Sequence, residues 1–173
     1  MYLGVHTPAD VSVSAAVALA LLLLLYPLIE KAREDRRVMW GIIAVASLIA
    51  SGFLIFMLVY PFPKDVDAEN LHSALKNAYT LAGCMLGLIA VYYFDEYHTR
   101  FETKAVWWIQ IIKVVGGLAL VFAAKEGLRA PLDNLFGGHL IARCLRYFIM
   151  VLVGGVLWPC TFKWFNKLER VKK

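Results

Sequence analysis

Charged side chains are scarce in this sequence, at 18% of 173 residues, whereas hydrophobic ones make up 61%. A soluble core of this size cannot bury so much apolar side chain. This composition excludes an ordinary soluble domain and indicates a membrane protein. The net charge is +5, but most basic residues stand in short runs between apolar stretches, where membrane topology explains them. We therefore predict no nucleic-acid partner.

Metal-binding and cofactor motifs are also missing. The three cysteines, Cys84, Cys144 and Cys160, form no CxxC pair and have no neighbouring histidine, as a zinc site would require. We therefore predict neither a metal nor a cofactor. No Lys or Arg precedes Lys31, although a secretory signal peptide needs a basic region before its apolar run. The first apolar run is accordingly predicted to be a retained membrane helix.

Five apolar segments are long enough to cross a bilayer, for which an α-helix needs about 20 mostly apolar residues. They cover residues 11–29, 38–60, 71–94, 106–124 and 141–162. The predicted fold class is therefore all-α, a polytopic membrane helix bundle with about five transmembrane helices. The third segment begins amphipathically, which predicts that its first turns lie at the interface or against another helix. Glycine pairs at 116–117 and 154–155 predict close helix packing.

Basic residues are divided unequally between the two sides of this predicted bundle. With the N-terminus outside, the cytoplasmic side holds Lys31, Arg33, Arg36, Arg37, Arg100, Lys104, Lys163, Lys167, Arg170, Lys172 and Lys173. The opposite side holds Lys64, Lys76, Lys125, Arg129, Arg143 and Arg146. Because positive charge is retained on the cytoplasmic side, we predict an extracytoplasmic N-terminus and a cytoplasmic C-terminus. Aromatic residues near the helix ends, Trp158 among them, are interpreted as interfacial anchors.

The segment 2–11, YLGVHTPADV, is the most specific part of the sequence. Pro8 suits the first position of a helix, Thr7 can cap that helix, and Asp10 falls at the third helical position. His6 then lies just before the helix. On these residues alone, a capping role for Asp10 and a loop position for His6 are the simpler interpretation.

The flanking residues favour a catalytic interpretation. The whole run resembles the third signature, SRxxxxxHxxxD, of the type 2 phosphatidic acid phosphatase family, with residues 1–5 filling the variable places before His6 and Asp10. The resemblance implies that His6 is the nucleophile that accepts the phosphoryl group. It implies that Asp10 orients the His6 ring and stabilises the imidazolium. The implied substrate is a lipid phosphate, and the implied partners are membrane lipids.

Other parts of that family's active site have no counterpart here. The Ser-Arg that opens the third signature is missing, and neither the KxxxxxxRP nor the PSGH signature occurs. The cations that should surround the phosphate oxygens are therefore not supplied. We expect that this chain alone does not turn over substrate.

The resemblance also implies two parts. Residues 1–30 look like the end of the phosphatase catalytic core, with the partial third signature and the last core helix. Residues 31–173 look like a C-terminal four-helix membrane extension found on some prokaryotic members, a likeness that rests on RFETK at 100–104 followed by WWIQ at 107–110. A bacterial or archaeal cytoplasmic membrane is thus the implied location.

Polar residues outside the N-terminal segment are further candidates. The 125–139 segment is predicted to be an outer loop with a short turn of helix, which could roof a lipid entrance. His139, Arg143 and Arg146 would then meet a phosphate head group, although lipid anchoring is the simpler role. Lys113, inside the fourth span, is expected to snorkel part of the way or to pair with Glu102.

Two functions remain open from the sequence. The first is the C-terminal part of a membrane lipid-phosphate or isoprenoid-phosphate phosphatase with a phosphohistidine mechanism. The alternative is a non-enzymatic polytopic membrane protein, a partner-binding or transport module, in which residues 7–10 are only a helix cap. The sequence leaves the identity of the lipid and the oligomeric state open.

Overall fold

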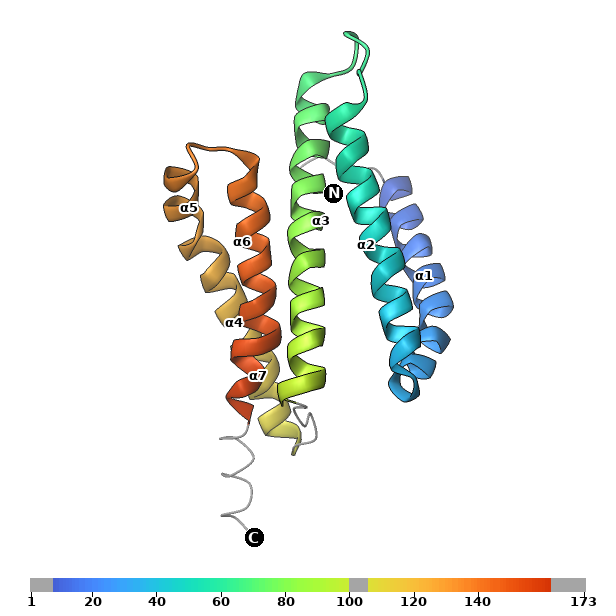
Figure 1. The fold of residues 1–173 in the computed structure, drawn as a ribbon, viewed down its shortest axis with the longest axis vertical. Coiled ribbons are helices and arrows are strands. Elements are labelled where there is room, and N and C mark those ends of the chain that lie inside the picture. The colour runs from blue at the N-terminus through green and yellow to red at the C-terminus, as the bar shows by residue number, and fades with distance from the viewer. Residues whose placement is uncertain (1–7, 100–105, 163–173) are drawn as a thin grey trace. The chain divides into compact units, whose positions relative to one another are not determined.

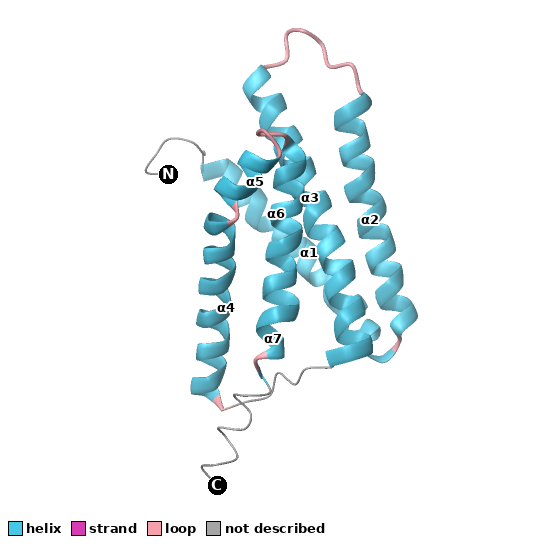
Figure 2. Ribbon diagram, turned by 60° about the vertical axis from the view of Figure 1, so that its left-hand side comes forward, coloured by secondary structure: helices cyan, strands magenta, loops and turns pink. Residues whose placement is uncertain are grey.

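The fold is all-α, and the computed structural model describes residues 8–99 and 106–162, with no strand among them (Figure 2). The elements are α1 (Pro8–Glu34), α2 (Arg36–Val59), α3 (Ala68–Phe94), η1 (Asp95–Thr99), α4 (Trp107–Gly127), α5 (Arg129–Leu135), α6 (Leu140–Leu152), η2 (Val153–Leu157) and α7 (Trp158–Cys160). The segments η1 and η2 are single π-helical turns. Five helices in the described part are long and apolar enough to cross a membrane, which confirms the predicted fold class.

The chain forms two compact units, residues 1–45 and 46–173. The first unit contains α1 and the beginning of α2. Pro8 is the first residue of α1, as predicted, because the N–H that proline lacks has no helical acceptor at that position. Asp35 separates the two helices, and its carboxylate accepts a hydrogen bond from the backbone N–H of Arg37 at 2.8 Å. This bond caps the start of α2.

The second unit contains the rest of α2 and all later elements. Within it, α3 and α6 run side by side in the same direction, and α4 runs in the opposite direction (Figure 1). The elements α6, η2 and α7 form one continuous helical stretch, Leu140–Cys160. The π-helical turn η2 ends just before Trp158-Pro159, where proline has no N–H to donate to the preceding turn.

Helix α3 begins earlier than predicted, at Ala68 and not at residue 71. The carboxylate of Asp67 accepts hydrogen bonds from the backbone N–H groups of Glu69 and Asn70, at 3.3 and 3.4 Å. An N-cap of this kind fixes the first turn even where the side chains are polar. The predicted start was too late because it followed the apolar residues and not the cap.

The predicted outer loop at 125–139 contains the short helix that was predicted, but most of the segment is helical, so the extent of the loop was overestimated. Helix α4 continues to Gly127 and α5 covers Arg129–Leu135. Pro131 does not interrupt α5, because it lies in the first turn of this helix, where the missing N–H of proline is tolerated. A short turn at 136–139 remains, in which Gly137 and Gly138 have φ values of 58° and 77°. Residues with a Cβ rarely adopt such values.

The contact between α3 and α6 depends on two glycines, Gly83 and Gly87, four residues apart on α3. Gly83 lies against the backbone carbonyl of Cys144. Gly87 lies against Val151, and a Cβ added to Gly87 would come within 2.6 Å of the Val151 Cβ. This spacing is the GxxxG pattern that lets two membrane helices approach closely. The pattern is visible in the sequence but was not among the predicted packing positions.

Changing Gly83 to Ala should lower the free energy of unfolding by about 1–3 kcal/mol, as overpacking of a tight contact does. The added methyl group would meet the Cys144 backbone, which cannot rotate away as a side chain can. The measurement is loss of helical circular dichroism on titration of the detergent-solubilised protein with SDS. Gly52 is the matched control, because nothing lies within 4 Å of its added Cβ. Gly52→Ala should be neutral or slightly stabilising, and equal effects of the two changes would contradict the close contact.

The glycine pairs at 116–117 and 154–155 pack as predicted. Gly116 and Gly117 face the indole ring of Trp158, whose Nε1–H donates a hydrogen bond to the Lys113 carbonyl at 2.7 Å. On the opposite helix, Gly154 faces Val121 of α4 and Gly155 faces Val91 of α3. Trp158 is therefore a packing residue between α4 and the α6–α7 stretch, and its interpretation as an interfacial anchor stays a prediction.

Lys113 is buried, with 6% of its surface exposed. Its Nζ lies 4.5 Å from the centroid of the Phe162 ring, a distance at which a cation is attracted by the ring face. The predicted partner Glu102 lies outside the described residues, so that pairing stays a prediction.

Candidate functional site

The predicted catalytic pair stands at the start of α1. Asp10 is the third residue of this helix, the position that the sequence predicted. His6 and the side chain of Asp10 lie outside the described residues. Their pairing, and the roles of nucleophile and orienting carboxylate, stay predictions.

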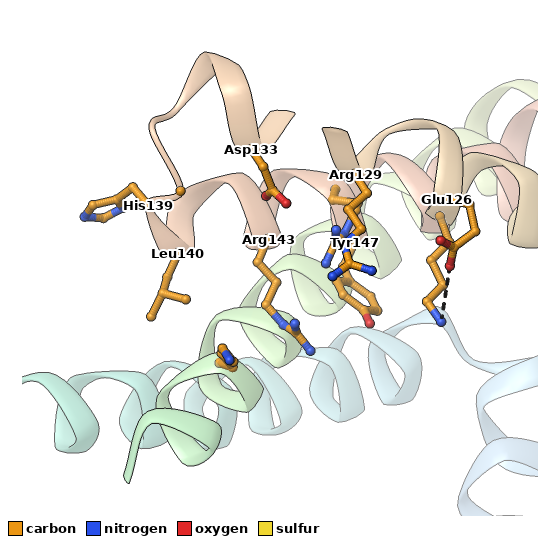
Figure 3. Close-up of a pocket in the computed structure, with 11 residues that line it drawn as sticks. Glu126, Arg129, Asp133, His139, Leu140, Arg143 and Tyr147 are labelled. Atoms are coloured by element: carbon orange, nitrogen blue, oxygen red, sulfur yellow. Dashed lines mark ion pairs between the residues drawn. The ribbon is translucent and has the colours of Figure 1, made fainter. Parts of the chain in front are cut away.

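A polar cavity of about 480 Å³ lies within the second unit, where the end of α4, α5 and the start of α6 meet α3. Five basic residues line it: Lys76, Lys125, Arg129, Arg143 and Arg146. Glu126 and Asp133 are its two acidic residues. Figure 3 shows Arg129 from α5 and Arg143 from α6 extending toward the region around Tyr147. We call this the basic cavity.

Arg143 is held in place by a hydrogen-bonded chain to α3. Its Nε donates to the Thr80 hydroxyl at 2.7 Å, and that hydroxyl donates to the Lys76 carbonyl at 2.9 Å. The guanidinium carbon also lies 5.5 Å from the centroid of the Tyr147 ring. These contacts use one nitrogen of the guanidinium, so its remaining N–H groups are available to a ligand.

Arg146 is the most buried charge of the basic cavity, with 8% of its surface exposed. Its guanidinium carbon lies 5.7 Å from the centroid of the Tyr147 ring. Its Nε is fully buried and has no hydrogen-bond partner among the described residues. Buried polar groups nearly always have a partner, so this nitrogen is an exception that calls for a reason.

His139 lies at the edge of the basic cavity and caps α6. Its Nδ1 accepts a hydrogen bond from the backbone N–H of Ile141 at 3.2 Å, and the side chain is exposed. Figure 3 shows the ring pointing away from Arg129 and Arg143. The structure thus brings two of the three predicted head-group residues, Arg143 and Arg146, into the same cavity and leaves His139 at its margin.

The basic cavity carries an excess of positive charge. Lys125 and Glu126 approach to 3.9 Å, but both side chains are about half exposed, and such pairs contribute little. No ion pair joins the other four cations to a carboxylate in the part of the chain that the structure describes. Over residues 8–99 and 106–162, no cluster of His, Cys, Asp and Glu is suited to hold a metal ion. The chemistry available here is therefore anion binding by basic side chains.

From the sequence, Lys76, Lys125 and Arg129 were predicted only as charges on the extracytoplasmic side. A stronger signal was present: of the six basic residues assigned to that side, all but Lys64 line the basic cavity. The spacing of His139, Arg143 and Arg146 also places them on one face of a helix. The sequence does not reveal that α5 packs against α6, a contact that depends on the helical form of 129–135.

The five long apolar helices indicate a helical integral membrane protein. Residues 79–170 match the family model described as PAP2 superfamily phosphatase, transmembrane extension. This match covers more than half of the chain, so the chain belongs to that family. No curated protein and no solved structure matches it. The resemblance to type 2 phosphatidic acid phosphatases is thus confirmed at the level of the superfamily, and the chain is a membrane protein related to these phosphatases.

Proposed function

We propose that the chain is the C-terminal part of a membrane phosphatase that hydrolyses a lipid phosphate or an isoprenoid phosphate through a phosphohistidine. The observation that carries the proposal is the family match over 79–170, preceded in the same chain by His6 and Asp10 at the spacing of the third signature. A catalytic histidine motif and a family-specific membrane extension are independent signals. Their presence in one chain favours the phosphatase over a non-enzymatic module.

In this mechanism the His6 imidazole attacks the phosphorus in line with the leaving lipid oxygen. The phosphorus–oxygen bond to the lipid breaks, and a phosphorus–nitrogen bond forms. Asp10 accepts a hydrogen bond from the other ring nitrogen and stabilises the positive charge that develops on the imidazolium. Water then attacks the phosphohistidine and releases inorganic phosphate. The KxxxxxxRP and PSGH signatures of a preceding catalytic part would supply the cations and the proton donor, with residues 1–30 completing that part and 31–173 forming the extension.

The proposed active site faces the extracytoplasmic side, and the C-terminus faces the cytoplasm. The larger number of Lys and Arg residues on the side of the C-terminus is the reason. Protease added to intact spheroplasts should remove a tag fused to the N-terminus and leave a C-terminal tag intact. Both tags should be cut once the membrane is permeabilised. Protection of the N-terminal tag in intact spheroplasts would contradict the proposed orientation.

The rival function, a partner-binding or transport module, treats 7–10 as a helix cap. Reading the coding DNA upstream of Met1 in the same frame separates the two. Ser-Arg directly before Met1, with a PSGH sequence further upstream, supports the phosphatase. A stop codon upstream in that frame, with no phosphatase signature between it and Met1, supports the rival function.

A further inference from the structure

We propose that the basic cavity is a binding site for the phosphate of an anionic lipid head group, built into the membrane extension itself. This site is separate in sequence from His6 and Asp10 and does not depend on turnover. The proposal rests on four observations: an uncompensated buried cation, a second cation held in place by α3, an excess of positive charge, and an apolar surface beside the cavity.

Arg146 is the main evidence for a bound anion. More than nine-tenths of its surface is buried, it lines the cavity, and its Nε has no hydrogen-bond partner within residues 8–99 and 106–162. A buried guanidinium without a carboxylate is costly for a membrane helix. A phosphate in the cavity would compensate this buried charge, because phosphate oxygens match the planar fork of arginine N–H groups.

Arg143 supplies the second half of a clamp. Its hydrogen bond to Thr80 fixes the Nε side of the guanidinium against α3 and leaves the other nitrogens for a ligand. Arg143 and Arg146 are three residues apart on α6, so both belong to the same face of the helix. Lys76, Lys125 and Arg129 then surround the anion as additional charges.

The size and surroundings of the cavity favour a lipid over a soluble anion. A volume of about 480 Å³ is within the range of small-ligand sites and exceeds what a phosphate ion alone requires. Helix α4 reaches the cavity at Lys125. Its residues Leu118 and Phe122 have 67% and 64% of their surface exposed. Leu118 lies about two turns before Lys125 and Phe122 about one turn before it, where acyl chains would run if the head group occupied the cavity. Basic pockets between membrane helices are a known way to hold lipid head groups.

The test uses the full chain, purified in an uncharged detergent, and measures its thermal unfolding midpoint during titration with dihexanoyl phosphatidic acid. The unfolding midpoint should rise saturably. Arg146→Gln should weaken the apparent affinity by about tenfold or more, the usual effect of removing a hydrogen bond to a charged group. Lys64→Gln is the matched control, because Lys64 is an exposed cation of the same unit that does not line the cavity. It should bind as the unmodified protein does.

Two further arms identify the ligand. Dihexanoyl phosphatidylcholine should bind at least tenfold more weakly than phosphatidic acid if the site requires the net negative head group. Inorganic phosphate should compete only at much higher concentration if the ligand is a lipid. Competition by phosphate at the same concentration would still support a phosphate site but would assign it to a soluble anion.

Ligand-free stability separates a binding role for Arg146 from a structural one. Without ligand, Arg146→Gln should unfold at the same temperature as the unmodified protein or higher, because it removes an uncompensated buried charge. If this variant does not fold, Arg129→Gln is the second test, since Arg129 is exposed and its loss should weaken binding about two- to fivefold. Phosphatidic acid binding that neither variant weakens overturns the proposal. Binding is measured without turnover, so this failure is distinguishable from failure of the proposed phosphatase function.

Discussion

Replacing His6 by Ala should abolish phosphate release from a lipid phosphate, with a loss of at least about a thousandfold, the scale seen when a covalent nucleophile is removed. The assay requires the chain joined to a catalytic part that carries the KxxxxxxRP and PSGH signatures, in detergent micelles that contain phosphatidic acid. Asp10→Asn should reduce turnover by at least about a hundredfold, because an amide cannot stabilise the imidazolium or hold the same tautomer of the ring.

Thr7 is the matched control for this pair. It is the predicted cap of α1, so Thr7→Ala should lower stability by about 1 kcal/mol while leaving most of the turnover. If His6→Ala retains full phosphate release, the catalytic interpretation of the N-terminal segment is wrong. The helix-cap interpretation would then be the better account of 7–10.

Replacing Trp158 by Ala should cost about 3–5 kcal/mol of stability, the usual range for truncating a large aromatic side chain in a packed site. The ring lies against Gly116 and Gly117, which have no side chains to fill the space that it would leave, and its Nε1–H donates a hydrogen bond to the Lys113 carbonyl. Trp158→Phe keeps part of the ring but loses the hydrogen bond, so its cost should be smaller, with about 1 kcal/mol due to that bond. SDS titration followed by circular dichroism measures both variants.

Trp107 is the control for the Trp158 variants, because 75% of its surface is exposed. Trp107→Ala should change stability by no more than about 0.5 kcal/mol. If the two tryptophan-to-alanine changes had equal small effects, interfacial anchoring would be the better account of Trp158 than packing. That result would contradict the packing of α4 against the α6–α7 stretch.

The number and type of the spans could be predicted because a bilayer demands long apolar helices whose backbone bonds are satisfied internally. This constraint acts on composition over about 20 residues, so it does not define helix ends closely. The start of α3 depends on the single carboxylate of Asp67. The extension of α4 to Gly127 and the formation of α5 depend on tertiary contacts in a segment that contains one proline and three glycines.

Helix packing was predicted only in part. The glycine pairs at 116–117 and 154–155 indicated close approach, but a glycine does not reveal its partner. Trp158 fills the first pair, and valines from two different helices fill the second. The sequence placed Trp158 near a helix end, where an anchor and a packing residue look alike.

The sequence could predict some of the basic residues of the cavity but not that they line one cavity. Arg143 and Arg146 were named as head-group candidates, and the structure places both in one cavity with three other cations. Lipid anchoring remained the simpler role from sequence, because a basic residue at a helix end normally reaches solvent or the interface. Arg146 is buried, and this burial distinguishes a residue of a binding cavity from an exposed surface charge. The burial depends on tertiary packing and therefore could not be predicted from the sequence.

The most direct test of the proposed function is transfer of ³²P from labelled phosphatidic acid to the protein, stopped by rapid quenching in alkali. In the joined protein, we expect a label that is stable to base, labile to acid and located in the peptide containing His6, and we expect His6→Ala to lack it. A label on another residue, or phosphate release with no labelled protein at any time, would contradict the phosphohistidine mechanism.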